Sequence, residues 1–321
     1  MCIRDRSEAN NLAIKGVAFA NVNGKNHIIT TTIEHPSVLN TCQWLEEHGF
    51  SVTYLPVDQE GMVSPDDLKA AITAKTCLVS VMMANNETGT LQPIPELAAI
   101  AKERGICFHT DGVQAAGKIP IDVQELGVDL LTMSAHKLHG PKGIGALFAR
   151  KGVELSPLIT GGNQERGLRA GTENIMGICG FGKAAELAIE QFPDMQHVKE
   201  KRDRLEQGIH ELIPNTKING PRYQRLPNTL NMTFPGMRGE SLVLALDQKG
   251  IAVSSGSACH AGMPTPSHVL LAMGLSEEEA HCALRFSLGR ENTVDDIDRT
   301  LSALKEITTD QKAMVRFVSC R

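Results

Sequence analysis

Two charged residues, Lys137 and Asp111, each stand at the end of an apolar run typical of a buried strand. Lys137 follows "VDLLTMSAH" and has histidines and a glycine-rich turn around it, whereas Asp111 closes "ICFHTD". A lysine that is partly desolvated beside cationic groups has a lowered pKa and can form a Schiff base. A carboxylate for the pyridine nitrogen is the second group that pyridoxal phosphate requires. The pair therefore predicts a site for that cofactor, whereas a single lysine at a strand end is more often a surface residue.

Other polar residues also follow apolar runs. In an open α/β sheet, ligands bind beyond the carboxyl ends of the strands, so these residues are candidates for the same site. They are Glu34, His35, Asn85, Asn86, Glu87, His109, Gln114, Ser134 and His136. Each has a structural alternative, since a single histidine is more often structural and asparagines commonly form turns.

The elements that would position these residues alternate along the first part of the chain. Apolar runs such as "HIITTTIEH" and "TCLVSVMM" alternate with amphipathic segments such as "IPELAAIAKERG". Short strands that are apolar almost throughout are typical of a parallel sheet covered by helices on both faces. The sequence predicts an α/β fold with a mostly parallel sheet in a large domain over residues 7–190.

The second part of the chain has a different pattern. A glycine-rich segment over residues 158–174 precedes a long helical region that we expect from Ile175 to Leu212. Strand-like runs then follow in "TLNMTFP", "IAVSSGSA" and "ALRFSLG", together with amphipathic segments. These features predict a smaller α+β domain over residues 191–321.

Composition narrows the class of protein. A chain of 321 residues with 41% hydrophobic and 21% charged residues can bury a core in each of two domains. A net charge of -5 argues against a partner that is a nucleic acid or an anionic membrane, and no apolar run is long enough to cross a bilayer. The eight cysteines are scattered without a C-x-x-C pair, which predicts reduced thiols in the cytoplasm and no metal site.

Seven short motifs link the two predicted domains. In chain order they are "EHPSV", "ANNETG", "HTDGVQAAGK", "SAHKLHGPKG", "QERGLRAGTEN", "SSGSAC" and "LRFSLGR". In this order the chain resembles the pyridoxal-phosphate cysteine desulfurases of the class V aminotransferase group, from Ser7 to about Lys305. The resemblance implies the type I fold of pyridoxal-phosphate transferases, with a seven-stranded type of sheet in the large domain, and it implies a homodimer.

The resemblance assigns cofactor roles to residues of the large domain. Lys137 would bond the cofactor covalently, and Asp111 would keep the ring nitrogen protonated. Gln114 would hydrogen-bond the phenolic oxygen with Asn86 nearby, and His35 would stack on the ring and carry a proton.

The same resemblance assigns the residues that would bind the phosphate and the substrate. Ser134, His136, Ser7 and, from the partner subunit of a dimer, Thr172 would bind the phosphate. Arg285, with Asn86, would hold the carboxylate of the substrate, a task that suits a planar guanidinium. Arg285 lies in a predicted strand, where it could equally pair with a glutamate of the same domain.

Cys259 is predicted to be the catalytic nucleophile. The expected reaction converts L-cysteine to L-alanine, with the sulfur transferred to a persulfide on the enzyme and then to an acceptor or scaffold protein. That sulfur would serve iron–sulfur cluster assembly or transfer-RNA thiolation. The nucleophile must then travel, and Cys259 stands at the start of a run of about ten residues, "HAGMPTPSH", that lacks strand or helix periodicity.

The start of the chain departs from the family pattern. Residues 1–6, "MCIRDR", do not continue into the helix expected from Ser7, and we interpret them as a non-native addition. We expect the amino-terminal segment of the family to be missing. A phosphate-binding turn rich in glycine would precede Ser7 in the family, so we also expect a weaker affinity for the cofactor.

Three alternative functions stay open. A selenocysteine lyase would use the same residues on selenocysteine, and a class V aminotransferase would not need Cys259. A non-catalytic scaffold would fit the loss of the amino-terminal segment, but it would not need Lys137 and Asp111, which are present.

Overall fold

The computed structural model describes residues 1–22, 24–255 and 265–318, and the side chains as far as residue 309. The chain divides into two compact units. The first comprises residues 1–86 and 90–192, and the second comprises residues 87–89 and 193–321.

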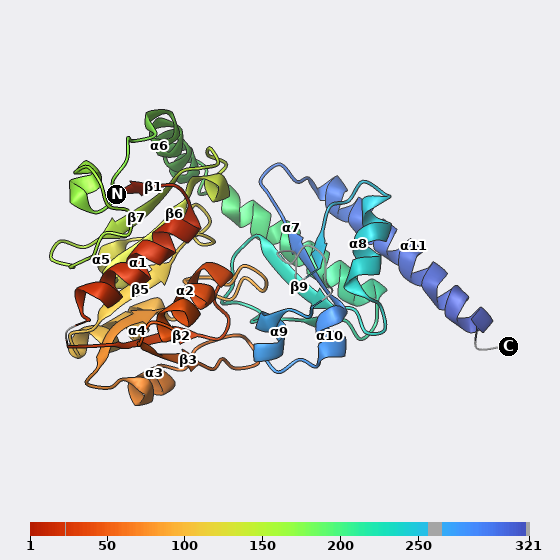
Figure 1. Ribbon diagram of the computed structural model, residues 1–321. Coiled ribbons are helices and arrows are strands. Elements are labelled where there is room, and N and C mark those ends of the chain that lie inside the picture. The colour runs from red at the N-terminus through yellow and green to blue at the C-terminus, as the bar shows by residue number, and fades with distance from the viewer. Residues whose placement is uncertain (23, 256–264, 319–321) are drawn as a thin grey trace. The chain divides into compact units, whose positions relative to one another are not determined.

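A seven-stranded sheet forms the centre of the first unit (Figure 1). Its strands are β1 (Cys2–Ile3), β2 (His27–Thr31), β3 (Ser51–Leu55), β4 (Thr76–Ser80), β5 (Cys107–Asp111), β6 (Leu130–Ser134) and β7 (Gly145–Ala149). Their order in space is β1-β7-β6-β5-β4-β2-β3. Strands β2 to β6 run parallel to one another, whereas β7 is antiparallel to β6 and β1 is antiparallel to β7. The predicted mostly parallel sheet is therefore confirmed.

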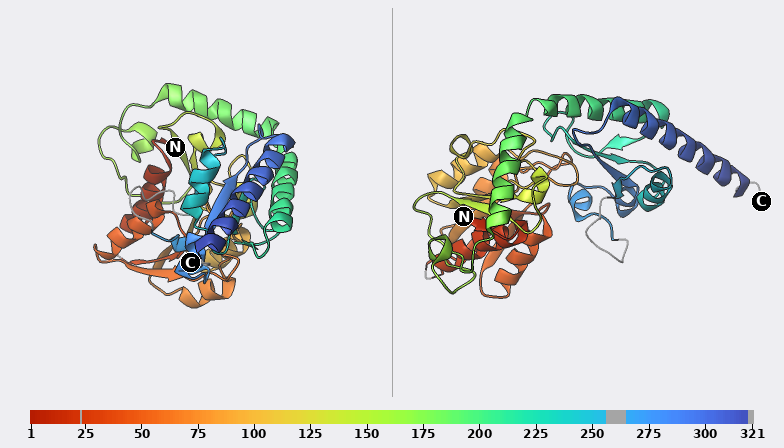
Figure 2. Two further views of the ribbon diagram at one scale, coloured as in Figure 1. Left: turned by 90° about the vertical axis from the view of Figure 1, so that its right-hand side faces the viewer. Right: turned by 90° about the horizontal axis from the view of Figure 1, so that it is seen from above.

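Helices cover both faces of this sheet. They are α1 (Arg6–Ala20), α2 (Pro36–Glu46), α3 (Pro65–Ala71), α4 (Ile94–Glu103), α5 (Val123–Leu126) and α6 (Ile175–Glu190), with short 3-10 turns η1 (Ala135–Leu138) and η2 (Gln164–Gly167). Helices α1 and α2 lie on one side of the sheet and α4 on the other (Figure 2, right). Leu12, Ile14 and Val17 of α1 belong to one buried core with Leu78 and Leu147 of the sheet. Burial on both faces explains why β2 and β4 have no exposed residue and read as apolar runs.

Side-chain caps fix where several of these helices begin. Asp5 accepts a hydrogen bond from Glu8 N at the start of α1, and Ser64 accepts from Asp66 N and Asp67 N at the start of α3. Such caps satisfy amide groups that have no partner within the helix.

The long helical region expected over residues 175–212 consists of two helices. Helix α6 ends at Glu190, and α7 (Asp194–Leu212) begins after Pro193. A proline lacks the amide hydrogen that a continuous helix would need, whereas it is tolerated where a helix starts.

A four-stranded antiparallel sheet forms the second unit, in the order β10-β11-β9-β8. Its strands are β8 (Lys217–Ile218), β9 (Thr229–Thr233), β10 (Ser254–Ser255) and β11 (Ala283–Ser287), and its helices are α7, α8 (Gly239–Asp247), α9 (His268–Ala272), α10 (Glu277–His281) and α11 (Val294–Val318). Leu230 and Phe286 of the sheet share a buried core with Leu205, Leu242 and Leu304 of the helices. This arrangement agrees with the α+β character predicted for the second part of the chain. None of the helices in the described ranges has the length and apolar character needed to span a membrane.

Candidate active site

Lys137 and Asp111 follow neighbouring parallel strands. Strand β5 ends at Asp111 and pairs with β6 in a register that places Asp111 opposite Thr132. Strand β6 ends at Ser134, and η1 follows at once with His136 and Lys137. Since carboxyl ends of parallel strands share one edge of a sheet, the structure brings these candidates to the same edge, as the sequence predicted.

Asp111 is buried, and both of its carboxylate oxygens accept hydrogen bonds within the first unit. Its Oδ2 accepts hydrogen bonds from Arg6 Nε at 2.6 Å and from Asn10 Nδ2 at 2.7 Å, and its Oδ1 accepts one from Val113 N at 3.1 Å. Burial by itself would raise the pKa of Asp111, but the Arg6 charge and these hydrogen bonds hold that pKa below its ordinary value. The carboxyl group is therefore ionised at neutral pH.

Arg6 reaches Asp111 because Cys2 and Ile3 join the edge of the sheet just before it. Strand β1 pairs with β7, with Cys2 opposite Ala146 and Ile3 opposite Gly145. A Cβ on Gly145 would lie 3.1 Å from the Asp5 Cα, so glycine permits this close approach. Helix α1 then begins at Arg6, whose side chain is buried.

Sequence reasoning missed the contact of Arg6 with Asp111. The signal that was available is the replacement of glycines by "RDR" before Ser7. That replacement predicted a weaker cofactor site, but it did not identify the carboxylate that the new charge would contact.

A second buried carboxyl, Glu34, lies near the same pair. Met82 N and Thr31 Oγ1 donate hydrogen bonds to Glu34 Oε1 at 2.7 Å and 3.0 Å. The pKa of Glu34 is raised to about 8, mainly by burial and also by the Asp111 charge, although the hydrogen bonds and the Arg6 charge oppose the shift. Glu34 is thus protonated at neutral pH, and the ionised Asp111 is the main anion beside Arg6.

His35 is connected to Asp111 through two other side chains. Ser37 N donates to His35 Nδ1 at 3.1 Å, so His35 caps α2 and a neutral ring carries its proton on Nε2. Ser37 Oγ lies 2.8 Å from the same nitrogen, and it accepts a hydrogen bond from Asn10 Nδ2 at 2.8 Å. The orientation of His35 is therefore coupled to the helix that carries Arg6 and Asn10.

The remaining polar candidates beyond β4, β5 and β6 differ in exposure, and Ser134 is buried. Ser134 Oγ lies 2.9 Å from His136 Nδ1, and both His136 and Lys137 have exposed side chains. Desolvation, followed by the charge of Lys137, lowers the pKa of His136. Gln114 Oε1 accepts a hydrogen bond from Lys118 Nζ at 3.2 Å, and Asn86 is half-buried.

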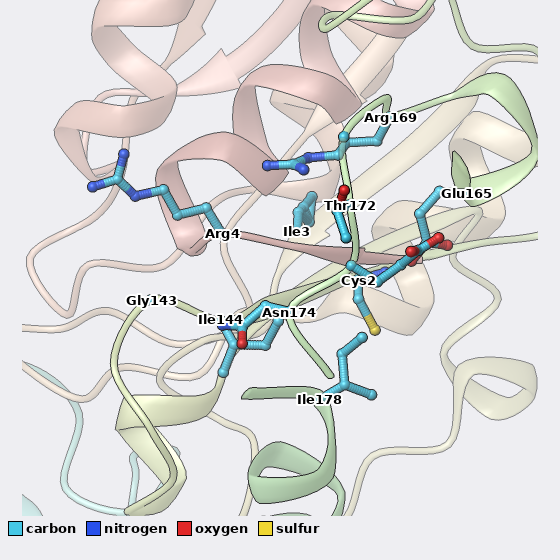
Figure 3. Close-up of a pocket in the computed structure, with 12 residues that line it drawn as sticks. Cys2, Ile3, Arg4, Gly143, Ile144, Glu165, Arg169, Thr172, Asn174 and Ile178 are labelled. Atoms are coloured by element: carbon cyan, nitrogen blue, oxygen red, sulfur yellow. The ribbon is translucent and has the colours of Figure 1, made fainter. Parts of the chain in front are cut away.

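Ser7 and Thr172 lie outside this group. Both are exposed, and Thr172 lines a cavity of about 260 Å³ together with Cys2, Arg4, Glu165 and other residues of the first unit. Figure 3 shows Thr172 beside Arg169 on the loop that passes over β1, with Glu165 turned toward Cys2. Neither Lys137 nor Asp111 lines this cavity.

Arg285 belongs to the second unit, where it lies close to Glu87. Arg285 is half-buried on β11, opposite Asn231 of β9 and Ser254 of β10. Burial raises the pKa of Glu87 to about 7, against the hydrogen bond from Ser267 Oγ at 2.5 Å and the Arg285 charge. Arg285 therefore has the charge of a glutamate of its own unit nearby, although Glu87 lies outside residues 191–321, the range predicted for the smaller domain.

Cys259 lies outside the described residues. Along the chain it follows β10, whose Ser254 pairs with Arg285, and it precedes α9. Within the described ranges no cluster of three histidine, cysteine or carboxylate residues has the geometry of a metal site.

Comparison with known proteins identifies the family. The model of the family "Aminotransferase class-V" matches residues 3–300. The chain belongs to the class V aminotransferase family.

Relatives within this family are cysteine desulfurases. "Cysteine desulfurase IscS" of Clostridium botulinum strain Hall is 54% identical over 311 residues, which cover 96% of this chain and 78% of that protein. A protein of the same name from Methanosarcina thermophila is also 54% identical, over 96% of this chain and 76% of its own length. A solved structure named "NIFS-LIKE PROTEIN" superposes with a TM-score of 0.89 at 40% identity, covering 96% of this chain and 82% of that one. The predictions of the fold type, of an enzyme and of cysteine desulfurase function are confirmed.

This family membership implies pyridoxal phosphate as the cofactor in general terms, and the residues present fit it in kind. An ionised, buried carboxylate suits a protonated ring nitrogen, and an exposed lysine stands at the next strand end. One feature of the donor set is unusual, because an arginine of the same chain already compensates the charge of that carboxylate.

Proposed function

We propose that this class V enzyme removes sulfur from L-cysteine with pyridoxal phosphate held beyond the carboxyl ends of β5 and β6. The single observation that carries the proposal is the pairing of β5 with β6, which gives Asp111 and Lys137 a common edge. When bound, the cofactor supplies an electron sink conjugated to the α-carbon of the substrate.

The residues of the first unit would bind and orient the cofactor. Lys137 would form the covalent bond, and Asp111 would hold the ring nitrogen. His35, whose Nε2 carries the proton in the neutral ring, would stack on the ring and move a proton. Ser134 and His136 would bind phosphate oxygens, since a hydroxyl and an imidazole both donate hydrogen bonds.

Further contacts are proposed for the remaining candidates. Gln114 would donate to the phenolic oxygen after release of its contact with Lys118. Asn86 would lie beside the ring and the substrate, and Ser7 would add a phosphate contact.

Arg285 and Cys259 would act on the substrate. The planar guanidinium of Arg285 would hold the carboxylate bidentately. The thiolate of Cys259 would attack the sulfur of the substrate: an S–S bond forms, the C–S bond breaks, and its electron pair goes to carbon, which takes a proton. The products are a persulfide on Cys259 and, on release, alanine. The persulfide would pass its sulfur to an acceptor protein.

We further propose that the enzyme is a homodimer through a face of α6. Met176, Ile189 and Ile175 are 86%, 74% and 63% exposed, although all three are large and apolar. Ile175 and Ile189 are fourteen residues apart, or about four helical turns, so they share one face, and Met176 adjoins Ile175 in the first turn of the helix. An apolar face of this kind usually marks an interface. A dimer would also give Thr172 a site on the partner subunit.

The experiment is an assay of purified chain incubated with pyridoxal phosphate, L-cysteine and a thiol reductant. We expect alanine and sulfide in equal amounts, and we expect Lys137→Ala to form neither. Lys142→Ala, which alters an exposed lysine of the same loop, is the matched control and should retain activity. Transfer of the amino group to a keto acid without sulfide would favour an aminotransferase, and inactivity of the wild-type chain would contradict the proposal.

A further inference from the structure

The Arg6 side chain lies against the carboxylate of Asp111, which the proposed cofactor site requires. Its side chain is buried, and its Nε lies 2.6 Å from Asp111 Oδ2. The position of Arg6 is fixed by the pairing of β1 with β7 and by the Asp5 cap of α1. Helix α1 in turn packs on the sheet through buried residues such as Leu12. The contact is therefore built into the fold of the first unit.

The acceptor capacity of Asp111 is almost used up by the chain itself. An ionised carboxylate has about four lone-pair positions. Arg6 and Asn10 take Oδ2, and Val113 N takes one position on Oδ1. A protonated ring nitrogen would also place a second positive charge beside a carboxylate that Arg6 has already neutralised.

The hydrogen bonding of the Arg6 guanidinium is incomplete. Its Nη2 is buried and has no hydrogen-bond partner among the described residues, and the same is true of Asn10 Oδ1. A buried donor without a partner costs free energy that a well-satisfied ion pair does not. Displacement of the guanidinium toward water would relieve this cost, whereas it would leave Asp111 without a cation until another one arrives.

We propose that Arg6, although it stands in the segment interpreted above as a non-native addition, acts in this chain as a resident counterion of Asp111 and competes with the ring nitrogen of pyridoxal phosphate. The inference rests on the proposed cofactor site. Without cofactor, Arg6 stabilises the fold by compensating a buried charge. With cofactor, the same residue weakens binding, so its removal has opposite effects on the two states.

The test uses the full chain with Arg6→Ala, with Arg6→Gln as a second variant that retains more of the side-chain volume, and with Arg4→Ala as the matched control. Arg4 is an exposed arginine two residues away. Melting temperature is measured without cofactor. Dissociation constants are measured by equilibrium dialysis for pyridoxal phosphate and for an analogue that has carbon in place of the ring nitrogen.

Both Arg6 variants should melt at a lower temperature than the wild type without cofactor. They should bind pyridoxal phosphate about tenfold or more tightly than the wild type, because a hydrogen bond to a charged group is worth at least that factor. Their affinity for the carbon analogue should be unchanged, since it offers Asp111 no ring N–H. Arg4→Ala should alter none of these quantities.

Several results would overturn the inference. Equal affinities of wild type and Arg6 variants for pyridoxal phosphate would do so while leaving the proposed function intact. If the Arg6 variants also bound the carbon analogue more tightly than the wild type, by the same factor, Arg6 would weaken binding by its volume and not by its charge. If neither the wild type nor any variant binds pyridoxal phosphate, the proposed cofactor site fails and the inference fails with it.

Discussion

Asn10 donates a 2.7 Å hydrogen bond from its side-chain amide to Asp111 Oδ2. The two residues are 101 positions apart in sequence, and both are buried. The same nitrogen of Asn10 also lies 2.8 Å from Ser37 Oγ, so one side chain joins α1 and α2 to the end of β5. Asp111 therefore depends on α1 for both its charge compensation and its orientation.

Asn10→Ala should destabilise the cofactor-free chain by about 1.5 to 3 kcal/mol, the usual range for a hydrogen bond to a charged group. Asn10→Asp should destabilise it more, because it adds a second carboxylate beside Asp111. Urea unfolding measures both. Asn11→Ala, whose amide contacts only the exposed Ser7 carbonyl among the described hydrogen bonds, is the control and should cost no more than about 0.5 kcal/mol. Equal effects at residues 10 and 11 would contradict the importance of the Asp111 contact.

Glu34 should make the stability of the chain fall as the pH rises. Its pKa is raised from an ordinary 4.5 to about 8 by burial, so between these values the folded state holds a proton that the unfolded state has lost. The stabilisation is complete below pH 4.5 and is lost as the pH passes through 8. The slope approaches about 1.4 kcal/mol per pH unit for one proton.

The measurement is urea unfolding of the cofactor-free chain between about pH 5 and pH 9. This range covers the pH values over which the folded chain is expected to release the Glu34 proton. Glu34→Gln should flatten the profile, since the amide can still accept from Met82 N and Thr31 Oγ1 but does not titrate. Glu47→Gln alters an exposed glutamate and should leave the slope unchanged. Glu87, with a pKa raised to about 7 by burial, should contribute a second slope of the same sign that ends about one pH unit earlier. Burial lowers the pKa of His109 to about 4, which adds a slope of the opposite sign at the acid end of the window. The deciding quantity is therefore the difference between the two profiles, and a Glu34→Gln profile parallel to that of the wild type would rule out a protonated Glu34.

The residues of the candidate site differ in how far the sequence could predict their positions. Lys137 and Asp111 could be placed because residues after parallel strands share an edge, and that rule needs only the strand pattern. Arg6 could not, because its burial depends on the pairing of Ile3 with Gly145, and helical periodicity in α1 says nothing about it. In the same way, the hydrogen bond of Glu87 joins it to Ser267, a residue 180 positions away.

Boundaries were also less predictable than the elements themselves. The apolar and amphipathic pattern of residues 175–212 predicts helix throughout. In the structure this region is interrupted, because α6 ends at Glu190 and α7 begins at Asp194, after Pro193. Among the described residues of "IAVSSGSA", only Ser254 and Ser255 form strand β10, each paired with a residue of β11, and residues 251–253 do not belong to the strand.

Arg285→Lys should raise the KM for L-cysteine by about 10- to 100-fold and lower kcat by a smaller factor. A point-charge ammonium cannot form the two parallel hydrogen bonds of a guanidinium with the substrate carboxylate. Steady-state kinetics at pH 7 measure both constants. Arg299→Lys, on α11 of the same unit, is the control. An unchanged KM in Arg285→Lys would exclude Arg285 from substrate binding and leave it only its charge interaction with Glu87.

Met176→Asp should convert the proposed dimer to a monomer. Met176 is the most exposed of the large apolar residues on α6, and a charge there would have to be desolvated in an interface. Sedimentation equilibrium gives the mass in solution. Leu244→Asp changes a residue of α8 that is 67% exposed and should leave the mass unaltered. A monomeric wild type, or a dimer that tolerates Met176→Asp, would contradict an interface at α6.

The most direct test of the proposed reaction is the location of the sulfur atom after a single turnover. The chain loaded with pyridoxal phosphate is mixed with an equimolar amount of L-cysteine without reductant, and its peptides are analysed by mass spectrometry. We predict one added sulfur on the peptide that contains Cys259, one alanine released per sulfur, and neither product in Cys259→Ala. Cys179→Ala, which changes an exposed cysteine of α6, should behave as the wild type. Alanine release that persists in Cys259→Ala, or added sulfur on another cysteine, would contradict the assignment of the nucleophile.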